Sequence, residues 1–201
     1  MDPARFASRT ATRSLFRSQA FPSGVDAVEA STPLYVPPAD VYRYIHEFEG
    51  SVDFADHVDR VDQSGDGGPG TDYYIRLSWW RLSWTSHSRV TEVDPPNRIE
   101  WRTVGEVRAR GTWLMEPLDD ARLPEGREAG TELTLRVEFD PASVRGAGVT
   151  RLMPIERLLR RVRPVVAREC ERLVEGAVAD LEGERRPVEY TVHRMPRSFS
   201  L

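Results

Sequence analysis

The sequence predicts an α+β domain in which one antiparallel sheet packs against a long C-terminal helix. Between residues 72 and 139, apolar and polar residues alternate in successive short segments, which is typical of half-buried antiparallel strands. From Pro154 to about Glu182, apolar residues recur at helical spacing, and a stripe of that length needs a large apolar partner. The apolar face of the predicted sheet is the partner that this chain offers.

The first elements precede a glycine-rich turn. A strand is expected over residues 25–36, where apolar residues alternate loosely with polar ones. Pro37-Pro38 then opens a helix that ends at Gly50 and carries its apolar residues on one face. A second short helix is expected over residues 52–58, before the flexible turn of residues 64–70.

Five further strands follow this turn. Their expected ranges are 72–79, 82–93, 98–103, 109–118 and 131–139. The long helix then starts at Pro154, and Gly183 ends it. Pro164 lies inside this helix and should kink it, because proline removes one backbone hydrogen bond.

These elements define one domain over residues 25–184, flanked by two tails. Residues 1–24 carry four arginines against one aspartate and few large apolar residues, which predicts a basic, disordered arm. An arginine- and serine-rich transit peptide is the alternative for this arm. Residues 185–201 form a tail in which the run 188–192 could add one strand.

Composition and charge exclude several classes of function. The net charge of −4 gives no general attraction to nucleic acid. The single cysteine excludes a disulfide framework within the chain and a cysteine-rich zinc site. No segment approaches the roughly 18 apolar residues of a transmembrane helix. A soluble, cytoplasmic protein that does not bind nucleic acid is therefore expected.

Four segments within this order of elements resemble one protein superfamily. They are Pro-Pro-Ala-Asp-Val-Tyr at 37–42, Arg-Val-Thr-Glu-Val-Asp-Pro-Pro-Asn-Arg-Ile-Glu-Trp at 89–101, Gly-Thr-Trp-Leu-Met-Glu-Pro-Leu at 111–118, and Gly-Thr-Glu-Leu-Thr-Leu at 130–135. Together with the order of elements over residues 25–183, they resemble the START-like, or SRPBCC, superfamily, which includes polyketide cyclase/dehydrase and coenzyme Q-binding-like proteins.

The resemblance implies a helix-grip fold, in which a curved antiparallel sheet wraps around the C-terminal helix, with two short helices after the first strand. It also implies a cavity for a hydrophobic or amphipathic small molecule. Members of the superfamily include lipid carriers, quinone-binding proteins, polyketide aromatase/cyclases, hormone receptors and co-chaperones. Because they share a pocket and no catalytic motif, the fold alone does not define a reaction.

Apolar residues on the strands and helices are the candidate lining of this cavity. They are Phe54, Tyr73, Ile75, Leu77, Trp79, Trp101, Trp113, Leu135, Leu158 and Val162. Aromatic rings offer flat stacking surfaces to a planar ligand, although ordinary core packing accounts for the same pattern. The candidate polar groups of the cavity are His57, Ser86, His87, Thr103 and Arg110.

No residue is assigned a catalytic role, and no cofactor or metal is expected. The four histidines lack the spacing of zinc ligands, and the glycine-rich segment 65–70 lacks the lysine and the helix of a phosphate-binding loop. Four arginines at the start of the long helix form a solvated face or contact an anionic membrane surface. They are Arg157, Arg160, Arg161 and Arg163.

Three functions are consistent with this sequence. The first is binding or carriage of a hydrophobic small molecule such as a lipid, quinone or polyketide-like compound. The second is a polyketide cyclase or dehydratase, in which a polar cavity residue positions an enolising chain. The third is a protein-interaction module that uses the arginine-rich start of the long helix.

Overall fold

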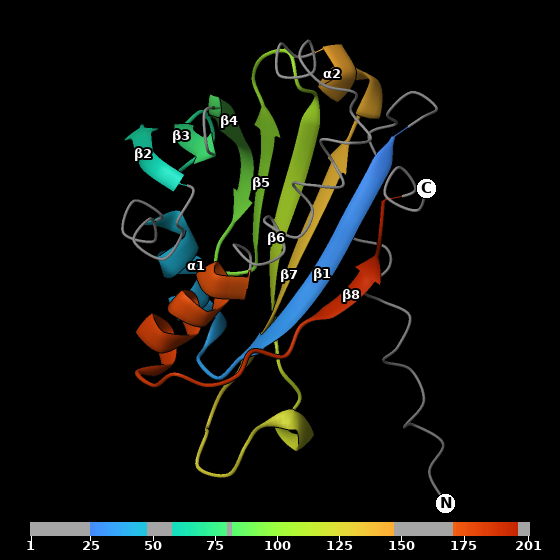
Figure 1. The fold of residues 1–201 in the computed structure, drawn as a ribbon. Helices are drawn as coiled ribbons and strands as arrows, with labels where there is room; N and C mark the ends of the chain where they lie inside the picture. The colour runs from blue at the N-terminus through green and yellow to red at the C-terminus, as the bar shows by residue number, and fades with distance from the viewer. Residues whose placement is uncertain (1–24, 48–57, 80–81, 147–170, 197–201) are drawn as a thin grey trace, which may run out of the picture.

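One eight-stranded antiparallel sheet dominates the computed structural model, which describes residues 25–47, 58–79, 82–146 and 171–196 (Figure 1). The strand order is β2-β3-β4-β5-β6-β7-β1-β8. The strands are β1 (Asp26–Leu34), β2 (Val58–Ser64), β3 (Asp72–Trp79), β4 (Leu82–Asp94), β5 (Arg98–Thr103), β6 (Ala109–Pro117), β7 (Thr131–Phe139) and β8 (Thr191–Arg194). The short helices are α1 (Pro38–His46), the 3₁₀ turn η3 (Asp120–Arg122) and α2 (Pro141–Gly146).

The predicted α+β class and the antiparallel sheet are confirmed. The strand expected over residues 25–36 and the five strands after the glycine-rich turn lie where the alternation placed them. The C-terminal helix is helical over residues 171–182 and ends before Gly183, whose positive φ of 75° suits a helix end. Residues 154–170 with Pro164, the arm of residues 1–24, and residues 52–57 of the helix expected over 52–58 lie outside the described residues.

Strand β2 is the strand that the sequence analysis missed. Its sequence, Val-Asp-Arg-Val-Asp-Gln-Ser, spaces its two valines three apart, which resembles one turn of helix. Only Val61 of this edge strand is buried, so no alternation is visible. Val58, expected at the end of a helix, instead pairs with Leu77 of β3.

The glycine-rich turn joins β2 to β3 and packs against α1. Gly67 adopts a positive φ of 87°, and a side chain at this position would overlap the imidazole of His46. The backbone N–H of Gly67 donates a hydrogen bond to Thr71 Oγ1 at 2.9 Å. Tyr73 in β3 donates its hydroxyl to the backbone oxygen of His46 at 3.2 Å. Glycine is therefore needed where the turn meets the end of α1.

The hydrophobic core lies between one face of the sheet and two helices. Val41 of α1 and Val178 of the C-terminal helix are fully buried against Val90, Ile99 and Met115. We call this side of the sheet the inner face and the opposite side the outer face. Figure 1 shows α1 and the helix of residues 171–182 (orange-red) together over one end of the inner face.

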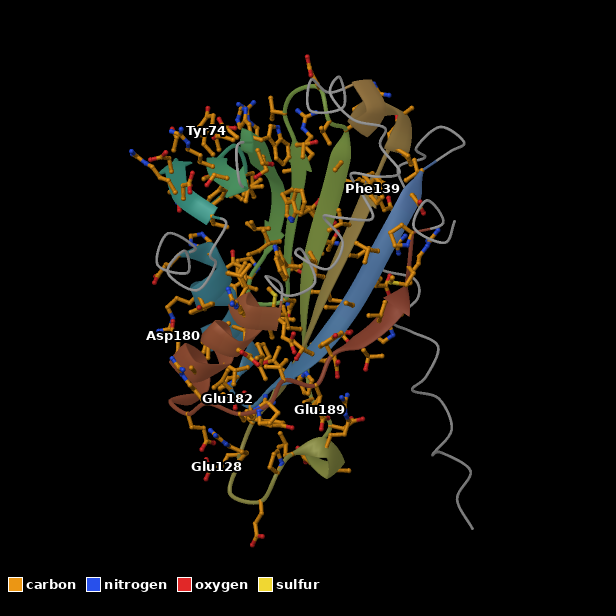
Figure 2. All side chains as sticks on the ribbon, viewed as in Figure 1. Tyr74, Glu128, Phe139, Asp180, Glu182 and Glu189 are labelled. Carbon is orange, nitrogen blue, oxygen red and sulfur yellow. The ribbon has the colours of Figure 1, made fainter. Side chains whose placement is uncertain are left out.

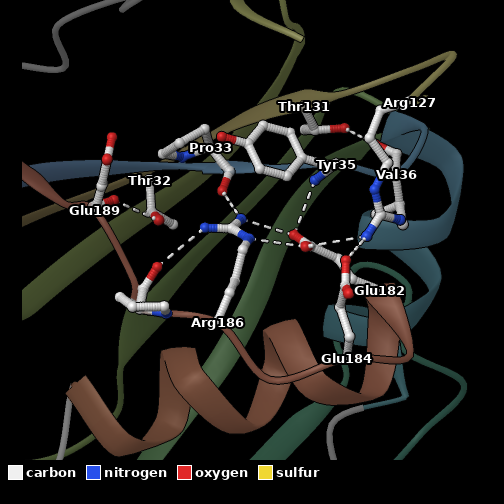
Figure 3. Close-up of polar contacts among 11 residues, drawn as sticks. Thr32, Pro33, Tyr35, Val36, Arg127, Thr131, Glu182, Glu184, Arg186 and Glu189 are labelled. Carbon is white, nitrogen blue, oxygen red and sulfur yellow. Dashed lines mark hydrogen bonds and ion pairs between the residues drawn. The ribbon is translucent and has the colours of Figure 1, made fainter. Parts of the chain in front are cut away.

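A buried ion pair fastens the end of the C-terminal helix to β1 (Figure 3). The side chain of Glu182 is 0% exposed, and Arg186 donates to both of its oxygens at 2.7 and 2.8 Å. The backbone N–H of Tyr35, just after β1, donates to the same carboxylate at 3.0 Å. Arg186 also donates to the carbonyl of Pro33 at 2.8 Å and stacks on the ring of Tyr35. This pair therefore positions the helix over the inner face.

The C-terminal tail continues from this pair into β8, which pairs with β1. The expected strand over residues 188–192 is displaced, because Val188 packs against the core and the carbonyl of Glu189 accepts a hydrogen bond from Thr32. Regular pairing begins only at Thr191, and His193 then bonds to Ser31 at 2.8 Å. One edge of the sheet is thus formed by the tail.

Candidate ligand-binding site

Strand pairing places most of the candidate cavity residues on the inner face. Trp101 pairs with Val90 on one side and Gly111 on the other, and Trp113 pairs with Ile99 and Leu135. Because directly paired residues share a face, these side chains lie on the side that contacts the helices. Tyr73, Ile75 and Leu77 of β3 have the same register, and Trp79 ends that strand opposite Leu82.

The inner face changes in burial from one end to the other. Near the helices, Val90, Ile99 and Met115 are 3%, 5% and 0% exposed. Farther from the helices, the apolar residues of the same face are only half-buried. These residues are Ile75, Leu77, Trp101, Trp113, Leu135, Val137 and Phe139. Phe139 marks the end of β7 that lies away from α1 (Figure 2). One end of the face is thus core, and the other keeps apolar surface available.

Trp101 forms part of the floor of this half-buried region. A side chain at Gly111, the residue paired with Trp101, would overlap the indole ring, so the ring occupies the space above Gly111. The indole therefore reaches from β5 across to β6, over Gly111. Because Trp101 is half-buried, part of the ring is left for whatever packs on the inner face, and stacking on an aromatic ring is favourable for planar apolar groups.

Hydroxyl groups are the polar side chains of this region. Ser86 lies on the inner face opposite Ile75, is half-buried, and has no hydrogen-bond partner in the described part of the chain. Ser88, which the sequence analysis did not single out, shares these properties opposite Tyr73. Thr103 also has inner-face register, but its hydroxyl donates to the carbonyl of Val107 and accepts from the N–H of Ala109. Ser86 and Ser88 are thus better placed than Thr103 to bind a ligand.

Asp26 is a second residue that the sequence analysis missed. It starts β1 opposite Phe139, and the residue is only 6% exposed. Its carboxylate accepts a hydrogen bond from the N–H of Ala27 at 3.2 Å. A single acid at the beginning of a strand carries no sequence signal of burial. The register alone places a carboxyl group at the far end of the inner face.

His87 and Arg110, two candidate polar residues, lie on the outer face. The ladder between β4 and β5 shifts register between Val90 and Glu92, and this irregularity reverses the alternation before it. His87 therefore points outward, bonds to Asp72 at 2.8 Å and stacks on Tyr74. Arg110 is three residues from Trp113, so it faces the opposite side and binds Glu138 at 2.7 Å. Neither side chain reaches the inner face.

The remaining candidates lie outside the described residues. Phe54 and His57 precede β2, and Leu158 and Val162 belong to the expected start of the long helix. The arginine cluster lies in the same part of the chain and includes Arg157, Arg160, Arg161 and Arg163. Their roles stay predictions.

The described residues contain no group of histidine, cysteine, aspartate and glutamate side chains that could hold a metal ion. Among the helices in the same ranges, none has the length and apolar character needed to cross a membrane. What the described inner face offers is an apolar, aromatic surface with hydroxyl groups and one buried carboxyl group.

Solved structures of several different proteins share this fold. TTHA0849 from Thermus thermophilus is 23% identical, with a TM-score of 0.55 over 78% of this chain and 97% of that chain. The Zhui aromatase/cyclase from Streptomyces sp. R1128 is 20% identical, with a TM-score of 0.54 over 79% and 92%. Ara h 8.0201 is 14% identical, with a TM-score of 0.54 over 80% and 100%. At these identities the likeness shows the fold, which is the expected helix-grip arrangement.

The sequence itself also matches a protein family. No curated protein matches the chain. A family model described as polyketide cyclase / dehydrase and lipid transport matches residues 26–182, which span β1 to the end of the C-terminal helix. This match covers most of the chain and confirms the resemblance to the SRPBCC superfamily. The chain therefore belongs to the polyketide cyclase / dehydrase and lipid transport family.

Proposed function

We propose that this protein binds a hydrophobic small molecule between the inner face of the sheet and the C-terminal helix. The observation that carries the proposal is the half-buried aromatic floor at Trp101, which continues directly from the fully buried core. Core packing would bury these residues as completely as Ile99 and Met115. A ligand that completes the burial of Trp101, Trp113 and Leu135 removes apolar surface from water, at about 25 cal/mol per Å².

The polar groups of the inner face suggest how such a ligand is oriented. Ser86 and Ser88 lie on β4, at one side of the aromatic floor, and their hydroxyls can both donate and accept hydrogen bonds. A ligand with a carbonyl, hydroxyl or quinone oxygen satisfies them while its apolar part covers Trp101. This division into an apolar wall with a few polar groups is the usual character of a small-molecule site.

The family description and the buried carboxyl group favour one alternative, a cyclase or dehydratase. The Zhui protein, of the same fold, is described as an aromatase/cyclase. A cyclisation of this type needs a base that removes a proton from a carbon between two carbonyl groups. Asp26 supplies a carboxylate base at one end of the inner face, while Ser86 and Ser88, four strands away on β4, bind a more distant carbonyl oxygen of the same chain.

Binding is tested by titrating the full-length protein with an apolar fluorescent dye, a short-chain quinone and a fatty acid, while tryptophan emission is followed. Saturable binding at micromolar concentrations is the expected result. Trp101→Ala should weaken binding about tenfold, because it removes about 1.4 kcal/mol or more of stacking and buried area. Tyr74→Ala, which removes an exposed aromatic ring from the outer face, is the control and should leave the affinity unchanged.

Two outcomes separate the alternatives. If none of the three probes binds, or if both variants bind like the unchanged protein, the inner face is not the ligand site. If a bound poly-β-carbonyl compound is converted to a ring product, and Asp26→Asn abolishes conversion but not binding, the protein is an enzyme. The third function, a protein-interaction module, and a cytoplasmic location stay predictions.

A further inference from the structure

A row of charged residues crosses the outer face of the sheet, on the side opposite to the proposed ligand site. Successive cross-strand pairs join Asp72 of β3, Arg89 of β4, Arg102 of β5, Arg110 of β6 and Glu138 of β7. Three arginines therefore stand side by side on three adjacent strands, with one acid at each end. Like charges directly opposite one another on a sheet destabilise it, so the folding of the sheet does not explain this order.

The acids at the two ends fix the outer arginines. Arg89 donates from Nε and Nη2 to the two oxygens of Asp72, both at 2.8 Å. Arg110 donates from Nε to Glu138 Oε2 at 2.7 Å. Hydrogen bonds from Arg89 and His87 lower the pKa of Asp72 to about 2, so this carboxylate stays ionised at neutral pH. Both flanking guanidinium groups are thus held in position before any ligand arrives.

Arg102, in the centre of the row, differs from its two neighbours. It is exposed, and it makes no hydrogen bond or ion pair within the described part of the chain. The nearest acid on its own strand and face, Glu100, lies beside Arg98 at 3.4 Å. The guanidinium N–H donors of Arg102 are therefore open to solvent, between the fixed guanidinium groups of Arg89 and Arg110.

We propose that Arg102 and its two neighbours form a binding site for a phosphate monoester on a small soluble molecule. A phosphate monoester carries a charge of about −1.5 to −2 at neutral pH and presents three acceptor oxygens. The planar fork of arginine matches two of those oxygens. A dianion also relieves the repulsion between the central arginine and its neighbours, whereas a carboxylate supplies one charge only. Because Arg89 and Arg110 are already fixed, little side-chain freedom is lost on binding.

The probe for this site is glycerol 1-phosphate, added to the full-length protein at constant ionic strength. Binding is followed by NMR through the Nε–Hε signals of the arginines. Saturable shifts centred on Arg102 are expected, with affinity reduced about tenfold in Arg102→Gln, which removes the charge and the fork. Arg102→Lys keeps the charge without the fork and should fall between the two. Arg60→Gln, which removes an exposed arginine already paired with Asp62, is the control and should bind normally.

The remaining arms of the experiment identify the chemical source of the anion. Acetate should bind much more weakly than glycerol 1-phosphate, and vesicles of phosphatidic acid should bind no better than the free ester. The proposal is overturned if no saturable shift occurs, if Arg102→Gln binds like the unchanged protein, or if acetate binds equally well. Binding only to vesicles would assign the row to a membrane surface instead. Because the row faces away from Trp101, failure of the hydrophobic-ligand proposal would not affect these outcomes.

Discussion

The buried pair Glu182–Arg186 allows a quantitative prediction about how the C-terminal helix is held. Glu182→Ala removes two hydrogen bonds from Arg186 and one from the N–H of Tyr35. Breaking a buried ion pair by removing one partner costs about 3–5 kcal/mol. Arg186 keeps its bond to the carbonyl of Pro33 and its position on the ring of Tyr35, which limits the loss. We therefore expect a loss near the lower limit, about 3 kcal/mol.

Urea unfolding measures this loss directly. In a thermal melt of a chain of this length, a loss of about 3 kcal/mol lowers the melting temperature by roughly 6–12 °C. Glu184→Ala is the matched control, because Glu184 lies two residues away and is 63% exposed in its pair with Arg127. Exposed pairs contribute about 0–1 kcal/mol, so the control should change little. Replacing Glu182 and Arg186 together by methionine should recover part of the loss, since no buried charge is then left unpaired.

The same carboxylate gives a pH dependence of defined sign. Burial raises the pKa of Glu182, but hydrogen bonds from Arg186 and from the N–H of Tyr35 outweigh it and hold the pKa below its ordinary value of 4.5. Its contribution to stability is therefore present above pH 4.5 and lost as the pH falls through the lower folded-state pKa. Glu182→Gln should reduce this acid-dependent loss. If Glu182→Ala and Glu184→Ala cost the same, or if the double variant shows no recovery, the pair does not anchor the helix.

Three further predictions concern the sheet. Gly111→Ala should cost about 1–3 kcal/mol in urea unfolding, because the new methyl group displaces the Trp101 ring, and adding Trp101→Ala should relieve that cost. Leu135→Asp should unfold the domain in thermal melts, whereas Thr134→Asp on the outer face should be tolerated; a smaller loss for Leu135→Asp than for Thr134→Asp would reverse the two faces. The pKa of Asp72 is lowered to about 2 from 3.8, so its contribution to stability is lost as pH falls through about 2, and Asp72→Asn should remove that step in acid unfolding curves.

Much of the sheet could be predicted from the sequence because its central strands bury one face only. Each such strand repeats apolar residues at every second position, so the same pattern predicts both the strand and the residues that face inward. Edge strand β2 buries one valine and is charged elsewhere, so it carries no such pattern. The six-residue helix α2 is also too short to show a helical period. Prediction therefore failed at the edges and connections of the sheet.

The candidate site was harder to predict than the strands, because it depends on which way each residue points. Counting back by twos from Val93 places His87 on the inner face, but the register shift between Val90 and Glu92 reverses the order. The same shift brings Ser86 and Ser88 inward, and no residue type in the sequence marks it. The burial of Asp26 is likewise set by its pairing with Phe139 on a distant strand. A single misplaced register step exchanges the two faces of a strand.

Strands β5 and β6 carry both proposed sites on successive residues. Trp101 lies over Gly111 on the inner face, while Arg102 stands beside Arg110 on the outer face. Because alternate residues of a strand point to opposite sides, the same backbone positions an aromatic floor on one side and a basic row on the other. The two surfaces therefore share a scaffold without sharing a side chain. Each substitution on one face thereby has its control in the next residue along the strand: Trp101→Ala should leave phosphate binding intact, and Arg102→Gln should leave hydrophobic binding intact.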